Sequence, residues 1–345
     1  IKNLYASEYI WNSIKDNKTV GIIGEDKQKG LTYVAEPIGV ICGVTPTTNP
    51  TSTTIFKAMI AIKTGNPIIF AFHPSAQQSS KHAAKVILEA AIKAGAPKDC
   101  IQWIEIPSIE ATKQLMNHKD IALVLATGGS GMVKSAYSTG KPALGVGPGN
   151  VPTYIEKTAH IKRAVNDIIG SKTFDNGMIC ASEQVMVVDK EVYTDVVKEF
   201  KLHQTYFVNK NELQQLEDAI MNEDKTAVKP DIVGKSAVDI AKLSGISVPE
   251  KTKLLVAEID GIGKDYPLSR EKLSPVLAMV TAKSTGHALQ ICEDTLKFGG
   301  LGHTAVIHTE DSQLQQKFGL KMKACRVLVN TPSAVGGIGN MYNVL

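Results

Sequence analysis

The segment Ile121-Ala-Leu-Val-Leu-Ala-Thr-Gly-Gly-Ser-Gly131 indicates the fold of the part of the chain that contains it. Its apolar half predicts a strand over Ile121–Ala126, and the glycines after it open a helix predicted over Ser130–Thr139. The first amides of a helix have no partner inside the helix, so Thr127–Gly131 could receive a phosphate. The segment therefore predicts a ligand at the carboxyl end of a parallel strand.

The same alternation of strand and helix continues on the N-terminal side of this segment. The predicted elements are helix Ser52–Lys63, strand Pro67–Phe72, a helix capped by Ser75 that runs to Ala94, strand Ile101–Ile106 and helix Ser108–Asn117. Apolar strands between helices of about ten residues predict a doubly wound parallel sheet in an α/β fold.

A second α/β block follows Gly145-Val-Gly-Pro-Gly-Asn150. Its predicted helices cover residues 159–170, 190–201, 210–222, 235–243 and 285–298. Its predicted strands cover residues 184–188, 253–258, 276–282, 305–308 and 326–330. A chain of 345 residues has room for two or three domains, so we assign the two blocks to separate domains.

Composition argues against several classes of partner. The net charge of +4 is small for this length and the basic residues are scattered, so we expect no nucleic-acid arm and no membrane-surface helix. No apolar run reaches the roughly 18 residues of a membrane span. The five cysteines form no Cys-x-x-Cys pair, which indicates a reducing, cytoplasmic compartment without a disulfide framework. We expect Cys42, Cys292 and Cys325 to be core thiols and expect no metal site.

Cys180 is the candidate nucleophile, in the polar loop Phe174-Asp-Asn-Gly-Met-Ile-Cys-Ala-Ser-Glu-Gln184. Thioester chemistry needs a thiol that attacks a carbonyl and later leaves, which a serine does poorly. An ordinary buried cysteine is the alternative.

Four segments give the chain a resemblance to a known family: Ala35–Ser52, Ala126–Lys134, Lys172–Gln184 and Phe298–Thr304. Together they resemble the CoA-acylating branch of the aldehyde dehydrogenase superfamily, and most of all the N-terminal acetaldehyde dehydrogenase part of bifunctional aldehyde–alcohol dehydrogenases. The resemblance implies a Rossmann-like dinucleotide-binding domain over residues 1–147, with a β-arm segment for oligomerisation at 20–37. It also implies an α/β catalytic domain over 148–332 and a return segment over 333–345.

The resemblance implies roles for four residues. Cys180 would carry the acyl group, and Asn49 would join the Cys180 amide in an oxyanion hole. Glu271 would hold the ribose hydroxyls beside the nicotinamide, and His303, with a pKa near neutrality, would move a proton to or from CoA. The alternatives are a turn asparagine, a surface acid and a buried hydrogen-bonded histidine.

A nicotinamide cofactor, NAD or NADH, is implied as well. The residues that would contact it are Thr45, Pro46, Thr47, His73, Thr127, Gly128, Gly129, Ser130, Gly145 and Gly147. A packed strand-end histidine is the alternative for His73. Hydrolytic relatives bind the adenosine ribose with a lysine and a glutamate, and this chain has Ala71 and Pro74 at those places. The preference for NAD over NADP therefore rests on fewer residues than dinucleotide binding does.

A missing carboxylate decides between acid production and acyl transfer. Hydrolytic relatives activate water with the glutamate of a Glu-Leu-Gly-Gly segment, where this chain has Gly145-Val-Gly-Pro-Gly149. Without that base the acyl-enzyme should persist until CoA attacks it.

The resemblance therefore implies a cytoplasmic enzyme that converts acetyl-CoA and NADH reversibly into acetaldehyde, NAD and CoA. It also implies a homo-oligomer, and filaments in a full-length protein with a downstream iron-dependent alcohol dehydrogenase. One alternative is a stand-alone enzyme for propionaldehyde or longer aldehydes. Another is a truncated binding or assembly domain, because the chain ends at Gly339–Leu345, before the segment that closes the active site and β-arm of the family.

Overall fold

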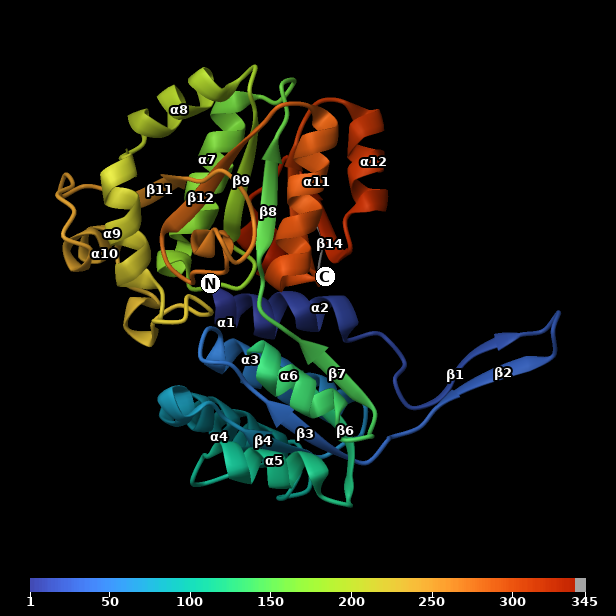
Figure 1. The fold of residues 1–345 in the computed structure, drawn as a ribbon. Helices are drawn as coiled ribbons and strands as arrows, with labels where there is room; N and C mark the ends of the chain where they lie inside the picture. Colours follow the sequence, from blue (N-terminus) through green and yellow to red (C-terminus); the bar gives the residue numbers. More distant parts are fainter. Residues whose placement is uncertain (339–345) are drawn as a thin grey trace. The chain divides into compact units, whose positions relative to one another are not determined.

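The computed structural model describes residues 1–338, which form two compact units with a parallel sheet in each (Figure 1). The first unit contains Ile1–Gly147, with Ile338 assigned to it, and the second contains Pro148–Gly337.

The sheet of the first unit has the strand order of a dinucleotide-binding domain. Its strands are β3 (Val40–Val44), β4 (Ile68–Ala71), β5 (Ile101–Trp103), β6 (Ile121–Thr127) and β7 (Ala143–Val146). They lie in the order β5-β4-β3-β6-β7, and every neighbouring pair is parallel. The order reverses between β3 and β6, and in open α/β sheets ligands bind in the crevice at such a point.

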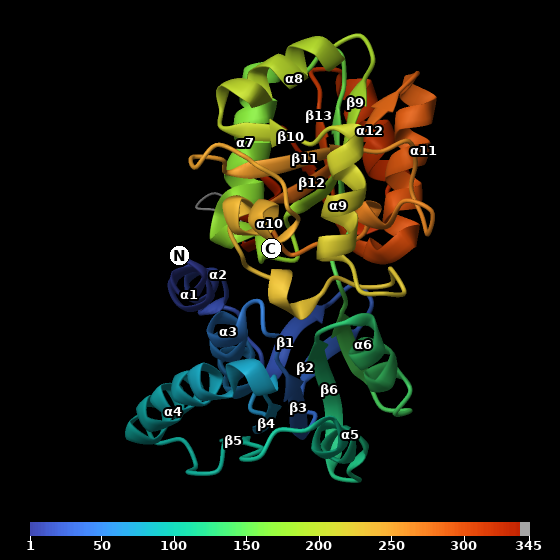
Figure 2. The same ribbon diagram turned by 60° about the vertical axis from the view of Figure 1, so that its left-hand side comes forward.

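Helices cover both faces of this sheet (Figure 2). Its helices are α3 (Pro50–Lys63), α4 (Gln77–Lys93), α5 (Ile109–Asn117) and α6 (Ser130–Tyr137). Ile41 packs with residues of α3 and α4, whereas the next residue, Cys42, packs with residues of α5 and α6. Successive strand residues point to opposite faces, so this division confirms the predicted doubly wound sheet.

An antiparallel hairpin, β1 (Gly21–Asp26) with β2 (Leu31–Ala35), stands clear of the five-stranded sheet of its own unit (Figure 1). It exposes Ile22, Tyr33 and Val34, each about half accessible to solvent. Before it the chain forms α1 (Lys2–Leu4), a π-helical turn (Tyr5–Tyr9) and α2 (Ile10–Ile14). The hairpin occupies the segment predicted as the β-arm.

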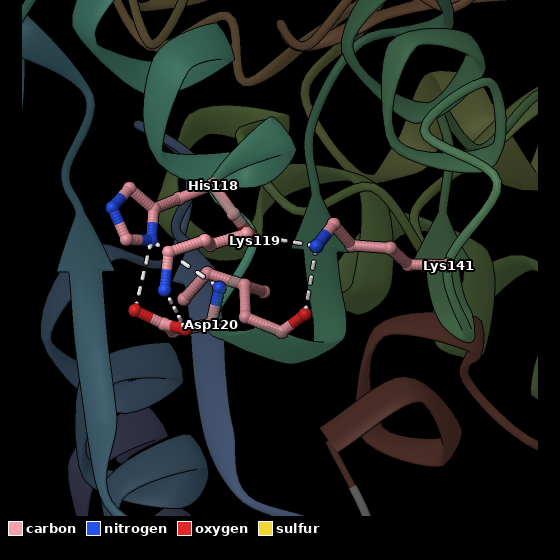
Figure 3. Close-up of polar contacts among 5 residues, drawn as sticks. His118, Lys119, Asp120 and Lys141 are labelled. Atoms are coloured by element: carbon pink, nitrogen blue, oxygen red, sulfur yellow. Dashed lines mark hydrogen bonds and ion pairs between the residues drawn. The ribbon is translucent and has the colours of Figure 1, made fainter.

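An exposed polar cluster joins α5 to β6 (Figure 3). The Lys119 ammonium donates to the Asp120 carboxylate at 2.9 Å, and the Asp120 amide donates to His118 Nδ1 at 3.3 Å. Lys141 Nζ donates to the carbonyls of His118 and Ile121 at 2.6 and 2.9 Å. The cluster lies at the amino end of β6, opposite the glycine-rich loop, and closes the turn that starts this strand.

The second unit contains a seven-stranded sheet. Its strands are β8 (Val151–Ile155), β9 (Glu183–Asp189), β10 (Thr205–Phe207), β11 (Leu254–Glu258), β12 (Val276–Ala282), β13 (Gly302–His308) and β14 (Ala324–Val329). They lie in the order β10-β11-β12-β9-β8-β13-β14, and all are parallel.

Its helices are α7 (Ile161–Thr173), α8 (Tyr193–Leu202), α9 (Lys210–Ile220), α10 (Ala237–Leu243), α11 (Thr285–Thr295), α12 (Ser312–Lys321) and α13 (Ser333–Ile338). Along β9, Val185 and Val187 pack with α11 and α12, whereas Met186 and Val188 pack with α7 and α8. A third core, which includes Leu216 of α9 and Ile240 of α10, covers the end of the sheet near β11.

Some details of the sequence prediction were wrong. Ser75 does not cap α4; His73 caps a short 3₁₀ turn over Pro74–Ala76, and α4 starts at Gln77. The strand predicted to reach Ile106 ends at Trp103, and a bend follows at residues 105–106. Cys325 is exposed rather than a core thiol, whereas Cys42 and Cys292 are buried as predicted. Residues 339–345 of the predicted return segment lie outside the described part of the chain.

Within residues 1–338, none of the helices combines the length and the apolar character that a membrane crossing needs.

Candidate functional site

The loop that carries Cys180 has an unusual backbone. Asp175, Asn176 and Gly177 follow one another with φ angles of 52°, 49° and 71°, the left-handed region that side chains other than glycine rarely adopt. Aspartate and asparagine adopt it more readily than other non-glycine residues, because their short polar side chains can form local hydrogen bonds. Strain of this kind is kept where the surrounding structure enforces it, and it often accompanies functional sites.

Specific contacts hold the loop. Asn176 Nδ2 donates to the Gly234 carbonyl at 2.9 Å. A methyl group on Gly177 would lie 2.6 Å from the Ser274 carbonyl oxygen, so only glycine allows this close approach. The Ser182 amide donates to the Ile179 carbonyl at 3.0 Å, which closes a turn around the half-buried Cys180.

Gly149 is the junction between Cys180, Glu271 and His303. A methyl group at Gly149 would overlap the Cys180 carbonyl oxygen and would lie 3.2 Å from His303 Cε1. The amide of Gly149 donates to Glu271 Oε1 at 2.9 Å. One glycine thus touches the cysteine loop, the imidazole and the carboxylate.

These residues meet at the amino edge of the seven-stranded sheet. Gly149 precedes β8, Cys180 precedes β9, Glu271 precedes β12, and His303 is the second residue of β13. All of these strands are parallel, so their amino ends share one edge. Residues separated by more than a hundred positions in the sequence are thereby brought together.

The Glu271 carboxyl is largely shielded from water. Burial raises its pKa from 4.5 to about 7, while the Gly149 amide and the ammonium groups of Lys172 and Lys272 act in the opposite direction. A carboxyl with a pKa near neutrality changes its charge within the physiological range.

A buried network behind Glu271 was missed by the sequence analysis. The Gln184 side-chain oxygen accepts from Lys172 Nζ and from the Lys272 amide, both at 3.0 Å. Gln184 Nε2 donates to the Ser182 hydroxyl at 3.2 Å. Lys272 Nζ donates to the carbonyls of Leu268, Arg270 and Gln184. Gln184 therefore connects the cysteine loop with the segment that carries Glu271.

His303 differs from the expectation of a pKa near neutrality. Burial, together with the neighbouring Arg326 cation, lowers its pKa from 6.5 to about 4. Its Nδ1 is 2.9 Å from the Thr304 hydroxyl, and its buried Nε2 has no hydrogen-bond partner among residues 1–338. The imidazole is therefore neutral at physiological pH.

The candidate cofactor residues of the first unit lie at the carboxyl edge of its sheet. Thr45–Thr47 follow β3, His73 follows β4, Thr127–Ser130 run from the last residue of β6 to the first of α6, and Gly145 and Gly147 lie at the end of β7. β3 and β6 are neighbours on the two sides of the reversal in strand order. This edge is where a doubly wound sheet binds its ligands.

Two groups at this edge are available to a ligand. The Thr45 hydroxyl is buried and has no hydrogen-bond partner within the described residues. Helix α6 begins after Gly129, which offers no side chain to cap the first amides. His73 is less available, because its Nδ1 accepts from the Ser75 amide at 3.2 Å.

Gly145 has a packing role. A methyl group there would lie 2.7 Å from Val133 Cγ1 and 2.8 Å from the Tyr137 ring. The Gly145 amide donates to the Tyr137 hydroxyl at 2.9 Å. By contrast, a methyl group on Gly147 would meet no atom within 4 Å.

Asn49 lies in the first unit, directly before α3, and its side chain makes no cap bond to the helix. Its Oδ1 is buried without a hydrogen-bond partner among residues 1–338. The side chain is therefore not used for the local turn that was the alternative interpretation.

Lys57 was also missed. It lies on α3, is buried, and its Nζ donates to the carbonyls of Val44 and Leu125 at 2.7 and 2.8 Å. These carbonyls belong to the carboxyl-terminal halves of β3 and β6, so Lys57 connects the two strands beside the reversal. Its only signal in the sequence was a lysine within the predicted helix Ser52–Lys63.

No cluster of three or more His, Cys, Asp or Glu side chains suited to a metal ion occurs in the part of the chain that the structure describes.

Comparisons with known proteins agree with this geometry. Residues 5–245 match the model of the aldehyde dehydrogenase family. The chain is 55% identical to an aldehyde-alcohol dehydrogenase of Streptococcus pneumoniae, over 99% of this chain and 40% of that protein. The chain thus spans about two fifths of the length of such curated relatives.

Two solved structures are similar throughout most of the chain. An acetylating aldehyde dehydrogenase from Geobacillus thermoglucosidasius has a TM-score of 0.95 and 48% identity, and the match covers 99% of this chain and 75% of that one. A propionaldehyde dehydrogenase from Rhodopseudomonas palustris, with bound CoA and an acylated cysteine, has a TM-score of 0.81 and 31% identity, covering 87% and 68%. The chain belongs to the aldehyde dehydrogenase family.

Proposed function

We propose that this chain is a CoA-acylating acetaldehyde dehydrogenase that interconverts acetyl-CoA and NADH with acetaldehyde, NAD and CoA. The observation that carries the proposal is the junction at Gly149, which places the Cys180 loop, the Glu271 carboxylate and the His303 imidazole around one residue. The relatives described as aldehyde-alcohol and acetylating aldehyde dehydrogenases support the same activity.

The residues present suit a nicotinamide dinucleotide. The Thr45 hydroxyl is buried without a partner in residues 1–338, and the start of α6 presents amides suited to a phosphate. Thr45–Thr47 and Thr127–Ser130 would hold the dinucleotide, with Glu271 on the nicotinamide ribose. When bound, NADH supplies the hydride that reduces the acyl group. We assign NAD(H) rather than NADP(H) on the resemblance alone.

Cys180 performs the covalent chemistry. In the reductive direction its thiolate attacks the carbonyl carbon of acetyl-CoA, the bond from this carbon to the CoA sulfur breaks, and the CoA thiolate leaves. The resemblance assigns Asn49 and the Cys180 amide as donors to the oxyanion of each tetrahedral species, where one such donor contributes about 3 kcal/mol. After reduction the Cys180 thiolate leaves the thiohemiacetal carbon, and acetaldehyde is released.

CoA rather than water accepts the acyl group in the oxidative direction. Hydrolysis would need a base that activates water, and the segment that matches the Glu-Leu-Gly-Gly of hydrolytic relatives, Gly145-Val-Gly-Pro-Gly149, contains no acid. Propionaldehyde or longer aldehydes stay as alternative substrates, because the Rhodopseudomonas palustris structure is that of a propionaldehyde dehydrogenase.

The test is NADH oxidation with acetyl-CoA, with release of acetaldehyde measured in parallel, for the unchanged chain and for Cys180→Ala. We expect turnover in the unchanged chain and none in the variant, while both bind NADH. Turnover that survives in Cys180→Ala would contradict the assignment of the nucleophile. NADH binding without turnover in the unchanged chain would instead favour a binding or assembly domain.

We further propose that the enzyme acts in the cytoplasm as a homo-oligomer through the β1–β2 hairpin. In a full-length protein it would be followed by an iron-dependent alcohol dehydrogenase and would form filaments. The free cysteines support the compartment, and the exposed apolar side chains of the hairpin support the assembly.

A further inference from the structure

Arg326 is a cation without a counter-ion in the second unit. It is a half-buried residue of β14, and its Nη1 is buried with no hydrogen-bond partner among the residues that the structure describes. None of the ion pairs formed within residues 1–338 includes it. Leaving a guanidinium nitrogen buried without a partner is costly, so the Nη1 group of Arg326 is suited to an anionic ligand.

The position of Arg326 relates it to the reacting cysteine. In the parallel pair of β13 and β14, Arg326 lies opposite Thr304, next to His303. A methyl group on Gly337 would overlap Ala181 Cβ and would lie 3.1 Å from Arg326 Nη1. Arg326 therefore lies beside the strand of His303, and its Nη1 and the side chain of Ala181, the residue after Cys180, both lie against Gly337.

Helix α13 holds this arrangement. The Ser333 hydroxyl donates to the Ala181 carbonyl, and the Ala334 amide donates to the Ser171 hydroxyl at 2.8 Å. A methyl group on Gly336 would lie 2.5 Å from the Leu328 side chain, so the helix packs closely on β14. The helix thus connects the strand of Arg326 to the cysteine loop.

The other titratable groups near this place do not neutralise the guanidinium. Burial and Arg326 together lower the pKa of His303 to about 4, so its imidazole is neutral and accepts a proton poorly. Glu183 accepts from the Ser333 amide at 3.0 Å, and its electrostatic partner is Lys172. The Cys325 thiol donates to the His303 carbonyl at 3.1 Å. Cys180 is the reacting group itself.

We propose that Arg326 is the cation that stabilises the CoA thiolate, both when CoA attacks the acyl-enzyme and when it leaves acetyl-CoA. This inference rests on the proposed function and adds to it a catalytic residue. In the oxidative direction the CoA thiol loses its proton to solvent, and its thiolate attacks the acyl carbon on Cys180. The new carbon–sulfur bond forms, the bond to Cys180 breaks, and the Cys180 thiolate leaves without any change in oxidation state. A neighbouring guanidinium lowers the pKa of the attacking thiol and thereby raises the fraction of thiolate.

The test separates acylation of Cys180 from transfer to CoA. Acetaldehyde and NAD without CoA should give a burst of NADH as the acyl-enzyme accumulates, and added CoA should then restart turnover. For Arg326→Gln we expect an unchanged burst, transfer to CoA slowed roughly tenfold near neutral pH, and a pH profile of transfer displaced upwards by about one unit. With acceptor thiols more acidic than CoA, the substitution should slow the transfer of the acyl group less than it does with CoA.

Two further variants serve as controls. Arg326→Lys keeps the cation and should keep the pH profile. Arg163→Gln removes an arginine of α7 that is paired with Asp167 and the Asn330 carbonyl, and it should leave both phases unchanged. A Gln variant of Arg326 with the normal pH profile of transfer overturns the inference, even if its KM for CoA rises. An unchanged chain that gives neither burst nor CoA-dependent turnover overturns the proposed function as well.

Discussion

Gly149 is the residue with the least free space at the site. Its amide holds Glu271 and its α-carbon lies against the Cys180 carbonyl and the His303 ring, so any side chain would displace at least one of these groups. Sequence patterns mark such a glycine only as part of a turn, because the atoms that exclude a side chain come from distant segments.

Replacing Gly149 with alanine should damage activity more than stability. The added methyl group displaces the Cys180 carbonyl, which we expect to cost about 1–3 kcal/mol of stability. Misplacement of the thiol should lower turnover roughly a hundredfold. Thermal unfolding and steady-state rates measure the two effects. Gly319→Ala on α12 is the control, because its methyl group meets no atom within 4 Å. This variant should have the same turnover as the unchanged chain. Unchanged turnover in Gly149→Ala would contradict the proposed junction.

Glu271 should make NADH binding depend on pH. Its pKa of about 7 means that the carboxylate, which we propose accepts both ribose hydroxyls, forms as the pH rises through neutrality. We expect the affinity for NADH, followed by its fluorescence, to rise across this range and then level off. Glu271→Gln should bind NADH more weakly at high pH and show a flatter profile. A profile that is identical in the two proteins would show that another group titrates.

At the scale of helices and strands, the sequence predicted the elements whose apolar residues recur with a regular period. Strand β12 has the predicted bounds, and β6 and α5 differ by one residue at one end. Strand β8 was missed because Pro152 argues against a central strand, and the structure places a register shift between Val151 and Pro152. Strand β10 was missed because it has three residues, too few for a pattern. Helix α12 was missed because it contains Gly319 and few apolar residues, so its helical pattern in the sequence is weak.

Lys57 should make stability depend on pH, because it joins α3 to β3 and β6. Burial lowers its pKa from 10.5 to about 7, so between these values the unfolded chain carries the proton and the folded chain does not. Unfolding then takes up a proton, and this contribution to the free energy of unfolding grows as the pH rises from 7. Chemical denaturation at several pH values should show the increase in the unchanged chain and a smaller one in Lys57→Met.

Lys57→Met should also lower the free energy of unfolding near neutral pH, by about 1–3 kcal/mol, because the carbonyls of Val44 and Leu125 lose their hydrogen-bond donor. Lys63→Met is the matched control on the same helix, where Nζ donates to exposed carbonyls of Lys15 and Asn17. If Lys63→Met destabilises the chain as much as Lys57→Met does, the connection between β3 and β6 is not the cause.

At the scale of the whole molecule, the sequence located Cys180, Glu271 and His303 through motifs, and the structure gathers them at one sheet edge. Their roles stay predictions. The buried lysines Lys172 and Lys272 could not be predicted, because a lysine in sequence is normally a solvated residue and only the packing reveals its burial.

The hairpin prediction concerns assembly. The exposed apolar side chains of β1 and β2 would be covered in an oligomer, so Val34→Glu should weaken association on the order of tenfold or more. Light scattering over a range of concentrations measures this. Gln28→Glu adds the same charge at the hairpin turn and should leave the mass unchanged. An unaltered assembly in Val34→Glu would place the interface elsewhere.

For protein engineering, the surroundings of Gly145 set a barrier. A designer who wants this chain to release free acid could place a glutamate at position 145, the first residue of the segment in which hydrolytic relatives carry their base. Its Cβ would collide with Val133 and Tyr137 and would disturb the bond from the Gly145 amide to the Tyr137 hydroxyl. Directed evolution by single substitutions therefore meets an unfolded or distorted intermediate first. The route from acyl transfer to hydrolysis is to replace Gly145, Val133 and Tyr137 together, so that smaller neighbours make room for the new side chain.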